Sequence, residues 1–192
     1  MKKRKNLIRN VKVLENKNMK KGQIWVETVI YTLIALVLIA IVIAVAKPKI
    51  DEYRDEALIS QTIVVLGYFD REILDAKQAP GNVRIPELMI KKGRINIKGA
   101  EDIIEYVLED SKKEYSEPGV VTKIGNVNVI TEKNKTTTIR IYLNYTDVNI
   151  TYNGEDREKS LQAASSPYKI KITNYGIPED GNLVNIDLME IS

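Results

Sequence analysis

The sequence predicts an α+β protein in which a long N-terminal helix, apolar and then amphipathic, is packed on a C-terminal antiparallel β-rich head domain. An uncharged apolar stretch closely follows a basic N-terminus, apolar residues then recur at helical spacing, and from Val83 onward they alternate with polar residues. We therefore expect a leader at 1–22, a long helix at 23–79 and a head domain at 80–192.

The composition excludes most familiar catalytic sites. The 192 residues provide for one domain with appendages, and they include no Cys and no His. Disulfides, thiolate nucleophiles, the usual general base and the commonest zinc ligand are therefore missing. We also find no phosphate loop, nucleophile elbow or paired-carboxylate motif. We expect a protein that is not an enzyme and that binds no cofactor or metal.

Charge is distributed unevenly along the chain. Residues 1–22 contain nine Lys or Arg residues and one acidic residue, Glu15, whereas the rest contains 20 basic and 25 acidic residues. A basic end can bind nucleic acid, but beside an apolar span its retention in the cytoplasm is the simpler interpretation. We expect a cytoplasmic N-terminus and no direct nucleic-acid partner.

The stretch from Thr28 to Ala46 contains no charged residue over 19 positions. As a helix it is roughly 28 Å long, close to the thickness of a bilayer core. A buried helix of a soluble protein usually has a polar stripe, which this stretch lacks. A secretory signal peptide is a second alternative, because Ala44-Val45-Ala46 has the form cut by the general signal peptidase, although its apolar part is usually shorter. We expect a single membrane span at about 24–46, with residues 80–192 outside the cell.

The residues where the basic leader meets the apolar stretch are Lys21-Gly22-Gln23-Ile24-Trp25-Val26-Glu27. This order resembles the class III signal peptide of type IV prepilins, particularly those of archaea. The resemblance implies cleavage between Gly22 and Gln23 by a membrane aspartyl prepilin peptidase, with Lys21 as part of the basic recognition sequence. Glu27 then becomes the fifth residue of the mature chain. Trp25 stands where many archaeal pilins have Ser.

The same resemblance implies how the chain assembles. In pilins the equivalent of Glu27 is thought to meet the new N-terminal amine of a neighbouring subunit, which sets the axial register of the filament. The implied partners are further copies of the chain, an assembly platform membrane protein and a cytoplasmic ATPase, and the product is a cell-surface pilus. The simpler alternative is a Glu27 side chain that extends to the cytosolic interface of the bilayer.

Two other functions stay open at this point. The chain can be an uncleaved, single-span membrane-anchored protein whose extracellular domain binds a partner. It can also be an extracellular enzyme on an anchor, which without His or Cys would need carboxylates, Ser or Tyr.

A helical pattern resumes directly after Pro48, so we expect this proline to bend the helix rather than to end it. The helix is expected to end near Ala79, before Pro80-Gly81-Asn82. Its second half, 49–79, is expected to be amphipathic. The expected apolar side consists of Leu58, Val65, Phe69 and Ile73, and the expected solvent side of Asp51, Glu52, Asp55, Glu56, Asp70, Arg71 and Glu72.

Period-two patterns predict the strands of the head domain. We expect a short helix at 100–110, with Ile103, Ile104, Val107 and Leu108 on one side. We also expect a hairpin turn at Lys92-Gly93. The expected strands are 88–90, 94–98, 120–124, 127–131, 138–145, 148–152, 168–173 and 183–191.

Three N-x-[ST] sequences lie in the head domain, at Asn134, Asn144 and Asn149. Each is a possible N-glycosylation site in an exported protein. Asn134 is the strongest candidate because 132–135 has the composition of an exposed hairpin turn. The Asp and Asn residues of 147–156 do not form a calcium loop, since Tyr152 occupies the position that requires Gly. Asn153-Gly154 instead predicts a tight turn.

Overall fold

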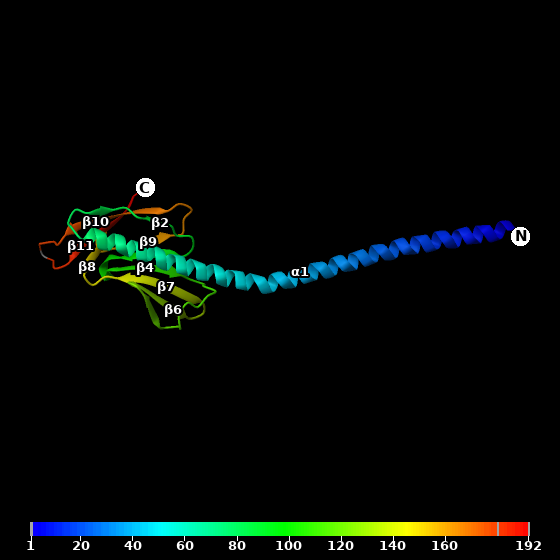
Figure 1. Cartoon of the computed structure of the whole chain (residues 1–192), viewed down its shortest axis with the longest axis horizontal. Helices are drawn as coiled ribbons and strands as arrows, with labels where there is room; N and C mark the ends of the chain where they lie inside the picture. Colours follow the sequence, from blue (N-terminus) through cyan, green and yellow to red (C-terminus); the bar gives the residue numbers. More distant parts are fainter. Residues whose placement is uncertain (1, 180, 192) are drawn as a thin grey trace. The chain divides into compact units, whose positions relative to one another are not determined.

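The computed structural model describes residues 2–179 and 181–191, with side chains from Trp25 onward. The chain forms two compact units, Met1–Ile50 and Asp51–Ser192. One helix, α1 (Lys2–Lys77), provides the described backbone of the first unit and begins the second, and the strands all belong to the second (Figure 1). The predicted α+β class, with one long N-terminal helix that is apolar in its first half, is confirmed.

The second unit contains eleven strands and one short 3₁₀ helix within the described residues. The elements are β1 (Val83–Arg84), β2 (Glu87–Leu88), β3 (Arg94–Lys98), η1 (Gly99–Glu101), β4 (Ile103–Leu108), β5 (Val121–Ile124), β6 (Val127–Lys133), β7 (Thr137–Asn144), β8 (Val148–Tyr152), β9 (Glu158–Gln162), β10 (Tyr168–Gly176) and β11 (Val184–Ile191).

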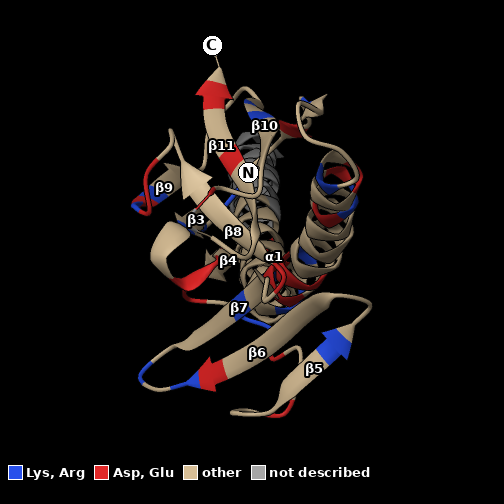
Figure 2. Ribbon diagram, turned by 90° about the vertical axis from the view of Figure 1, so that its left-hand side faces the viewer, with Lys and Arg blue, Asp and Glu red and all other residues tan. Residues whose placement is uncertain are grey.

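The strands form two sheets. The first has the order β1-β10-β11-β8, and β2 also pairs with β10. The second has the order β5-β6-β7-β4-β3-β9. In Figure 2, β10 and β11 lie at the top of the view and β5, β6 and β7 at the bottom. Pairing is antiparallel except between β8 and β11, which are parallel. The predicted antiparallel head domain did not include this parallel pair.

The core of the second unit contains residues from α1 and from both sheets. Its helical members, which recur every three or four residues, are Ile59, Ile63, Leu66, Phe69, Ile73 and Ala76. Ile139, Ile141 and Leu143 of β7 and Ile170 and Ile172 of β10 belong to the same buried cluster. Burial of this much apolar surface is the main favourable contribution to folding of the unit.

The expected helix at 100–110 is wrong. After the 3₁₀ turn of η1, Asp102 adopts a left-handed conformation with φ 54°, and β4 begins at Ile103. β4 lies between β3 and β7 and is almost wholly buried, so both of its faces are largely apolar. Such a strand shows no simple alternation, and its apolar residues also fit a helical spacing.

The expected hairpin across Lys92-Gly93 is also wrong, because β2 pairs with β10 of one sheet and β3 with β4 and β9 of the other. The chain therefore changes sheets at this turn. Gly93 has φ 79°, and a Cβ atom there would lie 2.5 Å from the Val107 carbonyl oxygen. Only glycine fits this close approach.

Two residues assigned to the solvent side of the helix, Asp55 and Asp70, are buried. Conversely, Leu58 and Val65, assigned to the apolar side, are only partly buried. The buried stripe is thus displaced from the expected one. Charged residues enter it because partners from the loops and turns of the head domain form hydrogen bonds with them.

Candidate functional site

The apolar part of the first unit exposes its side chains. The segment Trp25–Lys77 contains one helical window that is long and apolar enough to cross a membrane, with mean hydropathy 3.1, and none of that window is buried. Leu36, Val37 and Ile41 all have more than half of their surface accessible. Exposed apolar surface of this length is unfavourable in water and is stable in lipid.

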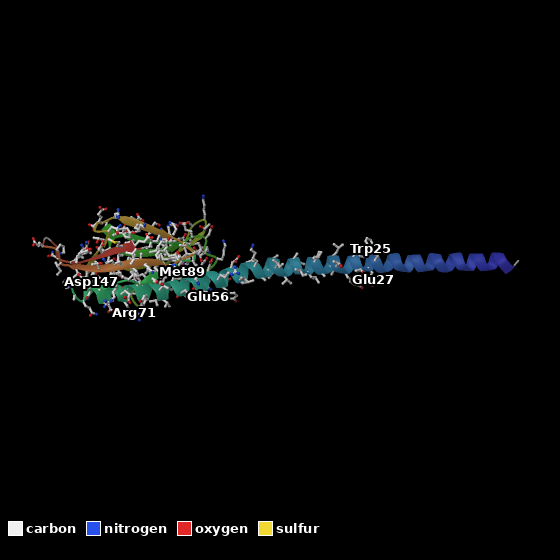
Figure 3. The ribbon with its side chains drawn as sticks, turned by 90° about the horizontal axis from the view of Figure 1, so that it is seen from above. Trp25, Glu27, Glu56, Arg71, Met89 and Asp147 are labelled. Atoms are coloured by element: carbon white, nitrogen blue, oxygen red, sulfur yellow. The ribbon has the colours of Figure 1, made fainter. Side chains whose placement is uncertain are left out.

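The expected processing residues Lys21, Gly22 and Gln23 lie within the helical backbone of α1, and their side chains lie outside the described part of the structure. Glu27 is described and exposed. Figure 3 shows Trp25 and Glu27 on opposite sides of the helix, as expected for residues two positions apart. Position 23 lies on the same helical face as Glu27, one turn earlier.

In the second unit, Asp55 connects α1 to two loops. Its Oδ1 accepts a hydrogen bond from Lys92 Nζ at 2.6 Å, and its Oδ2 accepts one from the backbone N–H of Lys112 at 2.8 Å. The carboxylate is buried, whereas the Lys92 side chain is half-exposed. The two hydrogen bonds compensate for burial of the charge and fix the loops beside the helix.

Asp70, further along α1, likewise connects the helix to residues that are distant in sequence. Its two carboxylate oxygens accept hydrogen bonds from the Tyr145 hydroxyl at 3.0 Å and from Asn126 Nδ2 at 2.8 Å. Burial, followed by the nearby charge of Asp70, raises the pKa of Tyr145 far above its ordinary value. The phenol therefore stays protonated and donates to the carboxylate.

Asn174 of β10 caps the end of α1. Its Nδ2 donates to the carbonyl oxygens of Ala76 and Lys77 at 3.0 and 3.1 Å, and its Oδ1 accepts from the Gly176 N–H at 2.6 Å. The last carbonyls of a helix have no partner within the helix. A buried side chain from the sheet supplies one here.

A second charged cluster lies between the strands. Arg140 Nη1 of β7 donates to Glu105 Oε1 of β4 at 2.8 Å, and Lys98 Nζ of β3 lies 3.4 Å from Glu105 Oε2. Burial alone would raise the pKa of Glu105, but hydrogen bonding and charge from Arg140, aided by Lys98, lower it below its ordinary value. Glu105 is therefore ionised and tightly paired.

An apolar groove of about 490 Å³ opens beside the first turns of α1 in the second unit. Its walls include Leu58 and Val65 of α1, Ile90 of the loop after β2, and Tyr106 of β4. Val64, Met89, Lys91 and Lys92 also contribute to the lining. The Tyr106 hydroxyl donates to the Lys92 carbonyl oxygen at 2.6 Å, and burial raises the Tyr106 pKa to about 12.

The three candidate glycosylation sites differ in accessibility. Asn134 is exposed between β6 and β7, and Asn144 is exposed at the end of β7. Asn149 is partly buried in β8. Thr151, the third residue of the same N-x-[ST] sequence, donates its hydroxyl hydrogen to Asp187 Oδ1 at 2.8 Å. Asn153 and Gly154 have φ of 53° and 75° in a tight turn, as expected for this pair.

Sequence reasoning missed the roles of Asp55, Asp70 and Asn174. A signal for the first two exists, because Asp55 lies four residues before Ile59 and Asp70 lies between Leu66 and Ile73 at helical spacing. Both acids are thus on the buried stripe itself. No local signal identifies the capping role of Asn174, since its partners in α1 are 97 and 98 residues away.

Comparison with family models, curated proteins and solved structures finds no match to this chain. In the part of the chain that the structure describes, no group of three or more acidic side chains is arranged to hold a metal ion.

Proposed function

We propose that the chain is a pilin-like structural subunit, a pilin or pseudopilin. In this function a prepilin peptidase removes residues 1–22, and the mature chain assembles into a cell-surface filament through its apolar helix. The observation that carries this function is the motif Lys21-Gly22-Gln23 with Glu27, placed directly before the uncharged stretch 28–46. The exposed apolar side chains of that stretch support it, since they need lipid or a neighbouring helix as surroundings.

Glu27 has a defined part in this function. A carboxylate inside a bilayer costs about 2.5 to 3.5 kcal/mol on insertion scales. Cleavage after Gly22 creates an amine at Gln23, and the equivalent amine of an adjacent copy is a suitable cation for Glu27. Pairing would offset the cost of burying Glu27 among helices and would fix the relative height of two copies.

We also propose an orientation of the chain in the membrane. The basic residues before the span favour a cytoplasmic N-terminus and an extracellular head domain. Outside the cell, Asn134 and Asn144 are exposed acceptors for N-glycosylation, and we expect less modification of Asn149 because Thr151 is buried. A platform membrane protein and a cytoplasmic ATPase would drive assembly.

The decisive experiment identifies the N-terminus of the membrane-extracted chain by mass spectrometry, after expression in cells that contain a prepilin peptidase. We expect the chain to begin at Gln23. Gly22→Leu should block cleavage, whereas the matched leader variant Asn18→Leu should not. An intact Met1 in the unsubstituted chain would refute processing and favour the uncleaved membrane-anchored protein.

Assembly is tested separately from cleavage. Glu27→Gln keeps the shape of the side chain and removes its charge, so we expect a normally processed chain without filaments in electron micrographs. Thr28→Val, at the adjacent position, should retain filaments. Filaments of normal number and length from Glu27→Gln would show that the charge is not used in assembly.

A further inference from the structure

The apolar groove beside α1 is bordered by cations. Lys91 is exposed and has no ion-pair partner among the described residues, and Lys92 is half-exposed beside Asp55. A second depression shares Leu58, Gln61, Lys91 and Lys92 with the groove and adds two cations, Arg54 and Lys112, and two acids, Asp51 and Asp55. The acids pair with Arg54 and Lys92, so Lys91 and Lys112 are the cations of this surface without an ion-pair partner among the described residues. The combined surface therefore suits a ligand that is apolar in one part and anionic in another.

The same unit exposes a segment of matching chemistry, which consists of the last two residues of β10 and the first three of the turn that follows and which we name the 175–179 loop. Tyr175 and Ile177 are 64% and 61% accessible, and Pro178 and Glu179 are also exposed. Gly176 has φ 82°, and the Gly181 N–H donates to the Pro178 carbonyl oxygen at 3.0 Å, which closes the turn. The loop thus projects two large apolar side chains next to an acid.

The groove and the loop lie at different points along the helical segment of this unit, the groove around its middle and the loop near its C-terminal end. The groove is formed by α1 residues between Leu58 and Val65, whereas the loop follows Asn174, which holds the end of α1 at Ala76 and Lys77. Figure 1 shows the β10–β11 connection at the end of the domain where α1 ends. Figure 3 shows Met89, which lines the groove, near Glu56 and away from the end of the domain that carries Asp147.

We propose that the 175–179 loop of one copy inserts into the groove of a second copy. Ile177 and Tyr175 would occupy the apolar part of the groove, and Glu179 would lie beside Lys91. The contact joins two different surfaces of one domain, so the copies at the two ends of an array keep a free loop and a free groove. A contact of this kind is open-ended and extends into a linear array.

This inference rests on the proposed filament function, because it assigns a contact between neighbouring head domains to the same polymer. In that polymer the apolar helices would hold the core and the loop-to-groove contact would connect successive head domains. Surface contacts with one ion pair and two apolar side chains are weak individually and become effective when the helices already hold the copies together.

Paired cysteine substitution tests the contact, because the chain has no cysteine of its own. The full chain carrying both Ile177→Cys and Met89→Cys is oxidised in membranes and in detergent micelles. We expect a ladder of cross-linked species on non-reducing gels. Ile177→Cys combined with Val121→Cys, which is exposed on edge strand β5, should yield monomer.

The single variant Ile177→Cys provides a further control. Dimers from this variant alone would indicate a symmetric contact and would overturn the proposal. Equal ladders from the Met89 and Val121 pairings would do the same. A groove found by native mass spectrometry to hold a co-extracted lipid, without any ladder, would also overturn it.

Charge exchange gives an independent test with exposed residues. Lys91→Glu or Glu179→Lys, each added to the Ile177→Cys and Met89→Cys chain, should reduce cross-linking about fivefold, the effect of one surface ion pair. The combination of both substitutions should restore it. Failure of this rescue would exclude the Lys91–Glu179 pairing.

The outcome can be separated from that of the proposed function, since the N-terminus and the filaments are examined in the same samples. Chains that begin at Gln23 and form filaments without a ladder would refute only the loop-to-groove contact. Chains that retain Met1 but form the ladder would refute processing and leave the contact as the route of self-association.

Discussion

Residues 25–46 and residues 51–77 belong to the same helix but differ in where their apolar side chains lie. In the first region they are exposed on every side, whereas in the second Ile59, Leu66 and Phe69 are buried in a core shared with two sheets. The second region also buries two acids, Asp55 and Asp70, each hydrogen-bonded to residues distant in sequence. Apolar content therefore does not by itself indicate the surroundings of a helix. The polar residues between the apolar ones distinguish a lipid-facing segment from a protein core.

The largest contrast is expected from truncating one apolar side chain in each region. Phe69→Ala should lower the free energy of unfolding of the head domain by about 3 to 5 kcal/mol, because Phe69 is 2% exposed and leaves a cavity. Leu36→Ala, at an exposed position, should change it by less than about 0.5 kcal/mol. Denaturant titration of the full chain in micelles, followed by circular dichroism of the strands, measures both. Similar losses would show that the two regions do not differ as described.

Next in size is the loss of a buried acid. Asp70→Ala leaves the Tyr145 hydroxyl and the Asn126 amide without their acceptor, which should cost about 2 to 3 kcal/mol. Asp75→Ala, which removes an exposed acid from the same helix, should cost less than about 0.5 kcal/mol. The same titration applies, and an equal effect at both positions would contradict a structural role for Asp70.

Tyr145 should also make the stability of the head domain depend on pH. Its pKa is raised in the folded state, chiefly by burial, so the unfolded chain loses the phenolic proton first, near pH 10. Stability should therefore be fully present below about pH 10 and fall by up to about 1.4 kcal/mol per pH unit above it. Tyr145→Phe should remove this contribution. Unchanged pH dependence in that variant would show that other groups dominate alkaline unfolding.

A smaller pH effect of opposite sign is expected in the sheet. The folded-state pKa of Glu105 is lowered, so its stabilising contribution is present above the ordinary value of 4.5 and is lost as pH falls through the folded-state pKa. Arg140→Gln should lower the free energy of unfolding by about 1.5 to 3 kcal/mol at neutral pH, since Glu105 loses a charged hydrogen bond. The difference from the unsubstituted chain should shrink in acid. A constant difference across this range would argue against the ion pair as its cause.

The smallest effect on the head domain is expected at Pro48, between the two regions compared. Proline provides no N–H for the carbonyl of residue 44, so Pro48→Ala should slow hydrogen exchange in the surrounding helix. Because the head domain has its own core, its unfolding free energy should change by less than about 0.5 kcal/mol. A larger change would show that this proline affects the stability of the head domain.

Local patterns predicted the strands that have one polar and one apolar face. The bounds of β3 (94–98) and β8 (148–152) agree with the structure, and β7 differs by one residue at each end. The pattern failed for β4, which is buried on both faces, and for β9, where Leu161 alone is buried and the main-chain bonds to β3 carry no side-chain signal. Pairing that depends on other segments is not encoded in local periodicity.

The candidate sites also differ in whether local sequence predicts them. The uncharged stretch and the Lys21–Glu27 motif each consist of contiguous residues, so both can be recognised from the sequence alone. The groove is formed by residues of α1, of the loop after β2, and of β4, and only the fold brings them together. The displaced buried stripe of α1 has the same cause, because loops and turns distant in sequence supply the partners of Asp55 and Asp70.

The Asn174 cap has a consequence for the order of folding. Its side chain caps a helix end that lies 98 positions earlier in the chain, and its backbone groups form hydrogen bonds with Gly81 and Asn82. These contacts cannot form until nearly the whole polypeptide has been synthesised and is free to approach the helix. Closing so long a loop slows folding, since its entropic cost precedes any gain from the contact. The last turn of α1 is therefore expected to gain protection late, together with β10 and β11, in pulse-labelling hydrogen exchange.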